Sequence, residues 1–80
     1  MLFITCVKIS PGKLEAARKF GDQLLKSPPK GVKFLKVYHT LGRYDAIWIY
    51  EATDPNVVKE FIKGSRDVAT TETWVAFERT

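Results

Sequence analysis

Residues 42–51, Gly-Arg-Tyr-Asp-Ala-Ile-Trp-Ile-Tyr-Glu, decide the fold of this chain. A glycine turn leads into a strand that is apolar on both faces, because successive side chains of a strand point to opposite sides. Ala46, Trp48 and Tyr50 share one face, and the isoleucines between them share the other. A chain of 80 residues is too short to cover both faces of such a sheet. Since soluble proteins avoid large exposed apolar patches, we expect a second copy of the chain to cover one face.

Length and composition indicate one small globular domain spanning residues 1–80. Apolar residues make up 45% of the chain and charged residues 28%, which is an ordinary globular balance. No apolar run reaches the length of a transmembrane helix, and the N-terminal residues lack the flanks of a signal peptide. The single cysteine, Cys6, has no partner for an internal disulfide, which suits a reducing compartment. We therefore expect a cytoplasmic protein without a membrane partner.

The net charge of +4 is unevenly distributed along the chain. Residues 1–36 carry eight basic and two acidic side chains, whereas residues 37–80 carry five basic and seven acidic ones. A concentrated basic face would indicate an anionic partner such as a nucleic acid. Here the basic residues are scattered singly among polar positions and form no block, which is typical of a solvated helix and loop.

Apolar periodicity and turn residues predict six elements. In chain order they are a strand over 2–9, a helix over about 11–26, strands over 32–41 and 44–52, a helix over 55–64, and a strand over 70–78. Ser10-Pro11 and Asp54-Pro55 each combine a capping side chain with proline at the first helical position. The apolar stripe of the first helix comprises Leu14, Ala17, Phe20, Gly21, Leu24 and Leu25. The short gap at Gly42-Arg43 predicts a hairpin.

The order strand-helix-strand-strand-helix-strand is that of the ferredoxin-like α+β fold. Right-handed crossovers place both helices on one face of a four-stranded antiparallel sheet. The first and third strands are central in this topology, and both are apolar on both faces. Alternation alone does not decide which set of side chains meets the helices. Face-to-face association of two sheets, giving a homodimer or a higher oligomer, is the simplest way to cover the remaining face.

Several short motifs in this order resemble the GYD-domain family of the dimeric α+β barrel superfamily. They are residues 9–13 (Ile-Ser-Pro-Gly-Lys), 41–46 (Leu-Gly-Arg-Tyr-Asp-Ala), Glu51-Ala52, Asp54 and 71–73 (Thr-Glu-Thr). The same hairpin and closing strand are similar to the ligand-binding (RAM) module of Lrp/AsnC-type regulators, which also occurs as a stand-alone domain. One departure is Arg66-Asp67-Val68-Ala69, where the Lrp-type module has a Pro-Gly-Val turn. This departure favours the GYD side and weakens any transfer of amino-acid binding.

The resemblance implies a stand-alone, oligomeric, small-molecule-binding or regulatory module with a ligand site near the hairpin, at a subunit boundary. The predicted ligand-binding residues are Gly42, Arg43, Tyr44, Asp45, Trp48 and Trp74. Arg43 would pair with an anionic group and Asp45 with an amine, as in an amino acid. The structural alternative is that Tyr44 packs and Asp45 bonds backbone at the turn. Similarly, Trp48, Tyr50 and Trp74 are typical anchors of a dimer interface.

An enzymatic alternative rests on His39, the single histidine. Other members of the superfamily are cofactor-independent monooxygenases or isomerases, so His39 is a weak candidate for a catalytic base. A lone histidine on a strand is more often structural. Cavity geometry separates the possibilities, because an enzyme needs His39 to point into a ligand-sized cleft, whereas a regulator needs a pocket between subunits.

Other function classes have less support in the sequence. RNA-recognition domains share this element order and stack bases on strand aromatics, but their strand motif is missing and acidic residues flank residues 45–51. One cysteine and one histidine do not make a zinc set, so we expect no metal. There is no glycine-rich phosphate loop, and we expect no cofactor. Cys6 is interpreted as an inert buried thiol.

Overall fold

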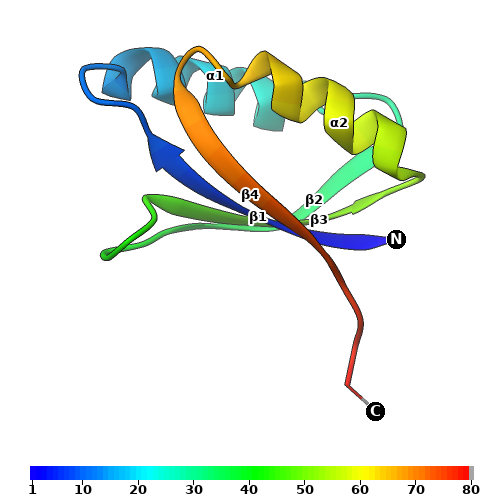
Figure 1. The fold of residues 1–80 in the computed structure, drawn as a ribbon. Coiled ribbons are helices and arrows are strands. Elements are labelled where there is room, and N and C mark those ends of the chain that lie inside the picture. Colours follow the sequence, from blue (N-terminus) through cyan, green and yellow to red (C-terminus); the bar gives the residue numbers. More distant parts are fainter. Residues whose placement is uncertain (80) are drawn as a thin grey trace.

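The computed structural model describes residues 1–79 and has the predicted ferredoxin-like α+β fold. Its elements are β1 (Leu2–Ile9), α1 (Leu14–Lys26), β2 (Val32–His39), β3 (Ala46–Ala52), α2 (Pro55–Gly64) and β4 (Ala69–Ala76). The strands form one antiparallel sheet in the order β2-β3-β1-β4, and both helices lie on one face of it (Figure 1). Neither described helix is long and apolar enough to cross a membrane.

The helices cover the face of β3 that carries its aromatic side chains. Trp48 and Tyr50 are 8% and 0% exposed, and their rings pack against Phe61 of α2 and Phe34 of β2. The interpretation of Trp48 and Tyr50 as anchors of a dimer interface is therefore wrong, because the helices of the same chain already bury both rings. The isoleucines of β3 consequently lie on the opposite face.

A small hydrogen-bonded group lies inside this core. The Thr5 hydroxyl is 2.7 Å from the Tyr50 hydroxyl and 2.9 Å from the Thr73 hydroxyl, so three strands are joined through one side chain. Burial raises the pKa of the Tyr50 phenol, while the hydrogen bond to Thr5 opposes this effect. Ionisation of Tyr50 in the folded protein therefore occurs above its ordinary value of 10.0.

Tyr50→Phe tests this buried group. At neutral pH we expect a loss of about 1 kcal/mol in unfolding free energy, since Thr5 keeps its bond to Thr73. Above pH 10 the Tyr50 phenol ionises more readily in the unfolded chain than in the folded protein. The wild type therefore becomes less stable as pH rises, whereas the variant, which has no phenol at this position, lacks this effect. Urea denaturation on both sides of pH 10 should show the gap between the two proteins narrowing as pH rises. A constant gap would contradict the assignment.

The two predicted helix starts have different outcomes, and α2 begins as expected. Asp54 Oδ1 accepts hydrogen bonds from the backbone N–H groups of Asn56 (2.7 Å) and Val57 (3.2 Å). Pro55 occupies the first turn, where no donor is needed. At the other end, the Ser65 hydroxyl donates to the carbonyl of Ile62. Both ends of α2 are thus held by side chains.

The prediction that Ser10 caps the first helix is wrong. Residues 10–13 form a turn in which the Lys13 N–H donates to the Ser10 carbonyl at 3.0 Å. Gly12 has φ +77°, a left-handed conformation that interrupts a right-handed helix. The helix therefore begins only at Leu14, and its N-cap residue Lys13 makes no side-chain cap bond.

The hairpin loop is longer than the predicted two-residue turn. β2 ends at His39 and β3 begins at Ala46, so residues 40–45 form the loop. The Thr40 N–H donates to the Asp45 carbonyl at 3.0 Å and closes its base. The last strand is also displaced, since it spans 69–76 rather than 70–78.

The sheet face away from the helices carries a second set of large side chains. Register pairs Ile4 with Ile49 on one side and with Trp74 on the other, which places all three on this far face. The large side chains of this far face are Leu2, Ile4, Tyr38, Ile47, Ile49 and Trp74, together with Cys6, and the charged residues Lys36 and Glu72 share the face. Tyr38 and Trp74 are each half exposed. No element within residues 1–79 covers this face.

Candidate functional site

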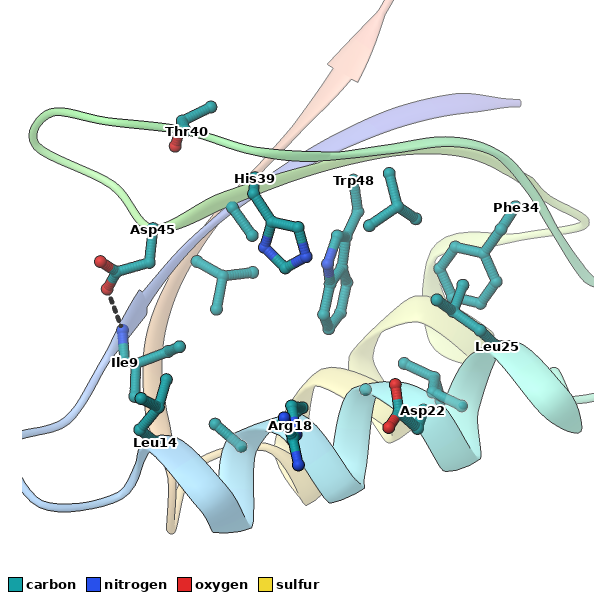
Figure 2. A pocket seen from close by; sticks show the side chains of 16 residues that line it. Ile9, Leu14, Arg18, Asp22, Leu25, Phe34, His39, Thr40, Asp45 and Trp48 are labelled. Atoms are coloured by element: carbon teal, nitrogen blue, oxygen red, sulfur yellow. Dashed lines mark hydrogen bonds between the residues drawn. The ribbon is translucent and has the colours of Figure 1, made fainter.

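A pocket of about 430 Å³ separates α1 from the sheet. Figure 2 shows β2 and β3 on one side of the pocket and α1 on the other. Phe34, Val37 and Trp48 form its floor on the sheet. The helix contributes Leu14, Ala17, Arg18, Gly21, Asp22, Leu24 and Leu25. Most of these side chains are apolar, so the pocket offers mainly van der Waals contacts to an occupant.

The pocket exists because the two helices pack differently. α2 buries Val58 and Phe61, whereas no residue of Leu14–Lys26 is fully buried. Phe20 and Leu24 reach the core only partly. The positions of α1 that face the middle of the sheet are small, so α1 stands away from β2 and β3 and leaves space beneath it.

Polar groups gather at the hairpin end of the pocket. The Asp45 carboxylate accepts a hydrogen bond from the Ile9 N–H at 2.7 Å, drawn as the dashed line in Figure 2. The Thr40 hydroxyl donates to the Tyr44 carbonyl at 2.6 Å. Asp45 therefore holds the hairpin loop against the end of β1, and Thr40 stabilises the loop internally. The His39 imidazole points into the pocket beside the indole of Trp48 (Figure 2).

The charges on the helix side of the pocket are exposed. Arg18 forms an ion pair with Glu15 at 3.4 Å, with both side chains about two-thirds exposed. Such a pair contributes little to stability in water. Asp22 lies one turn further along α1, also at the pocket. These groups leave the opening polar while the interior stays apolar.

The outer part of the hairpin forms a separate cluster. The Arg43 guanidinium lies 5.8 Å from the centre of the Tyr44 ring, within the range of a cation–π contact. The Tyr44 hydroxyl donates to the Glu72 carboxylate of β4, and this hydrogen bond raises the pKa of Tyr44. Gly42, at φ +150°, forms the tip of the loop. This cluster lies outside the pocket.

The predicted ligand-binding residues are thus divided among three places. Asp45 and Trp48 line the pocket, Trp74 lies on the far face of the sheet, and the hairpin residues Gly42, Arg43 and Tyr44 lie outside. Within one chain, Trp48 and Trp74 do not share a wall. Sequence reasoning missed the α1 side of the pocket, although the small residues Ala17 and Gly21 within its apolar stripe were the available signal.

Cys6 is buried on the far face opposite Glu72 of β4. Burial raises the pKa of its thiol, and the neighbouring Glu72 carboxylate adds to this effect. A protonated thiol in this position is a poor nucleophile. Among residues 1–79, no three His, Cys, Asp or Glu side chains lie close enough to hold a metal ion.

The structure places the protein among the ferredoxin-like α+β domains, and solved structures that share its fold include a transcriptional regulator. The chain belongs to the family described as Domain of unknown function (DUF3303), which matches residues 1–79. The family comparison therefore does not support the GYD name, and the similarity to solved structures confirms the fold. Comparison with curated proteins gave no match.

Three solved structures illustrate the likeness. MtbAldR superposes with a TM-score of 0.73 at 17% identity, over 99% of this chain and 55% of that one. A transcriptional regulator from Neisseria meningitidis, solved with L-Met, gives 0.62 at 18% identity, over 99% and 52%. SnoaB, a cofactor-independent oxygenase from Streptomyces nogalater, gives 0.52 at 14% identity, over 99% and 92%. The chain spans about half the length of the first two of these proteins. At these identities the likeness shows a shared fold.

Proposed function

We propose that this protein is a small-molecule-binding module of the regulatory kind, and that its ligand occupies the pocket between α1 and the sheet. The pocket itself carries the proposal. Ligand sites are typically cavities of roughly 300–1,000 Å³ with apolar walls and a few polar groups, and this pocket of about 430 Å³ has that character. The shared fold of a transcriptional regulator solved with L-Met supports a regulatory role.

The site lies at the base of the predicted hairpin rather than at its tip. Asp45 lines the pocket, but its carboxylate already accepts the Ile9 N–H, so we assign it to holding the hairpin in place. Arg43 and Tyr44 are exposed or only half-buried. A ligand at the tip would be enclosed only where a second copy packs against the hairpin, which is the subunit-boundary site predicted from the sequence.

Two substitutions separate these locations. Ala17→Leu narrows the pocket from the helix side, whereas Arg43→Ala removes the outer cation without touching the pocket. Native mass spectrometry of the purified protein detects a co-purified ligand, and thermal unfolding with added L-methionine and other amino acids detects stabilisation by mass action. We expect ligand binding to be lost in Ala17→Leu and kept in Arg43→Ala.

The other outcomes are equally informative. Binding lost in Arg43→Ala and kept in Ala17→Leu would move the site to the hairpin tip. Binding unaffected by both substitutions would contradict the proposal at both locations. Circular dichroism of each variant checks that the fold is retained.

A second candidate function is that of a cofactor-independent enzyme with His39 as the base. The observation that favours it is the imidazole directed into the pocket beside Trp48 (Figure 2). The shared fold of SnoaB is consistent with it. If His39 is a base, His39→Ala should abolish conversion of the co-purified ligand and leave its binding within a few-fold. A binding module should release the ligand chemically unchanged in both proteins.

We propose further that copies of the chain associate through the far face of the sheet. Ile4 and Ile49 pair across β1 and β3, and both are only partly buried within one chain. Trp74 continues the apolar surface onto β4 and is half exposed. Apolar surface of this extent is characteristic of an interface.

A further inference from the structure

Two small residues of α1, Ala17 and Gly21, leave open space between the helix and the sheet. Leu14, Ala17, Gly21 and Leu24 recur at helical spacing and all line the pocket. The outer two are large, as on any helix face that meets a sheet, but the central two are the smallest residues available. Glycine in a helix interior is less stable than alanine by roughly 0.5–1 kcal/mol.

Neither backbone geometry nor packing requires glycine at position 21. The left-handed glycines among residues 1–79 are Gly12, Gly31 and Gly42. A Cβ added to Gly21 would meet no atom of residues 1–79 within 4 Å. Gly64 of α2 differs, because a Cβ there would touch the Phe20 ring at 3.6 Å. Between the two helix glycines, open space is therefore found at Gly21, which lines the pocket, and not at Gly64.

Unfilled apolar space lowers stability, since its walls lack packing partners. α1 thus combines a helix-weakening residue with open space at the same position. Binding sites commonly have lower stability than well-packed parts of a protein, because they must leave room for a ligand. The volume below Ala17 and Gly21 is bounded on the sheet side by Trp48, Phe34 and Val37.

The lining also restricts the chemistry of the occupant. Asp45 and Thr40 already bond the chain itself, and Arg18 pairs with Glu15 at the exposed helix surface. His39 is the remaining polar side chain at the hairpin end that points towards the pocket, and it is also exposed to solvent. Burying a charge without a partner is strongly unfavourable. The interior therefore suits an apolar body with one hydrogen-bonding group, and a zwitterion would meet charged side chains only at the exposed opening, at Arg18 and Asp22.

We propose that the ligand is a largely apolar, uncharged molecule with a single hydrogen-bonding group directed towards His39, and that Ala17 and Gly21 set its maximum size. This inference rests on the proposed function and narrows its ligand class. It is tested with N-phenyl-1-naphthylamine, an uncharged ring compound with one N–H that becomes fluorescent in apolar surroundings. L-Methionine and L-phenylalanine serve as zwitterionic competitors.

We expect Gly21→Leu to weaken binding of the dye by about 10-fold or more, because extra methylenes occupy a hydrophobic pocket. The same variant should unfold at higher temperature, since leucine favours the helix. Gly64→Ala, the matched control on α2, should bind the dye like wild type. Neither amino acid should displace the dye.

The contrary outcomes separate the two proposals. If L-methionine binds and Gly21→Leu abolishes that binding, the pocket site stands and the proposed ligand class is wrong. If Gly21→Leu binds the dye normally while Ile49→Lys does not, the dye occupies the far face and this inference fails. If neither the dye nor the amino acids bind in a manner sensitive to Gly21→Leu, both the ligand class and the pocket function are refuted.

Discussion

Phe61→Ala is expected to lower the unfolding free energy by about 3–5 kcal/mol. The Phe61 ring is 7% exposed and lies 5.3–6.4 Å, centre to centre, from the rings of Tyr50, Phe34 and Trp48. These contacts are the main attachment of α2 to the sheet. Alanine would leave a cavity among aromatic rings that cannot collapse, because the strands carrying them are fixed by their hydrogen bonds.

This loss is large for a protein of this size. A domain of 80 residues has a total stability on the order of 4–12 kcal/mol, so Phe61→Ala should be close to unfolding at 37 °C. Urea denaturation followed by circular dichroism measures the change. Phe77→Ala, at a residue 88% exposed, is the matched control and should stay within about 0.5 kcal/mol of wild type. A loss below about 1 kcal/mol for Phe61→Ala would mean that α2 is held elsewhere.

The element order was predictable because apolar residues recur at clear strand and helix spacings along this chain. The helix boundaries were less predictable, as the two sequence signals for a helix start show. Asp54-Pro55 starts α2, whereas Ser10-Pro11 starts only a turn. The difference lies in the next residue, since Gly12 adopts a left-handed conformation that no pattern of capping residues reveals.

The candidate site was less predictable than the fold. Alternation in β3 showed two apolar faces but not which one the helices cover, and so Trp48 and Trp74 were grouped although they lie on opposite faces. The pocket depends on how far α1 stands from the sheet, which is a tertiary property. Ala17 and Gly21 were identified as part of an apolar stripe, yet their small size, rather than their apolar character, creates the space.

The second large effect is expected at the far face, where Ile49→Lys should convert the associated protein to monomer. Ile49 lies opposite Ile4 on β1, near the middle of the apolar surface. In a face-to-face pair, the lysine ammonium would be placed between the apolar side chains of two sheets, where burying a charge is strongly unfavourable. We expect the dissociation constant to rise by roughly 100-fold or more, on the order of 3 kcal/mol.

Sedimentation over a range of concentrations measures this change. Leu41→Lys, the same kind of substitution at a fully exposed residue of the hairpin loop, should leave association unchanged. Because Ile49 and Trp48 point to opposite faces, the variant should keep its fold and its pocket. A wild-type protein that stays monomeric at all concentrations, or an Ile49→Lys variant that still associates, would rule out the far face as the interface. Loss of association with retained pocket binding would show that each chain carries a complete site, so that the oligomer serves another purpose than enclosing the ligand.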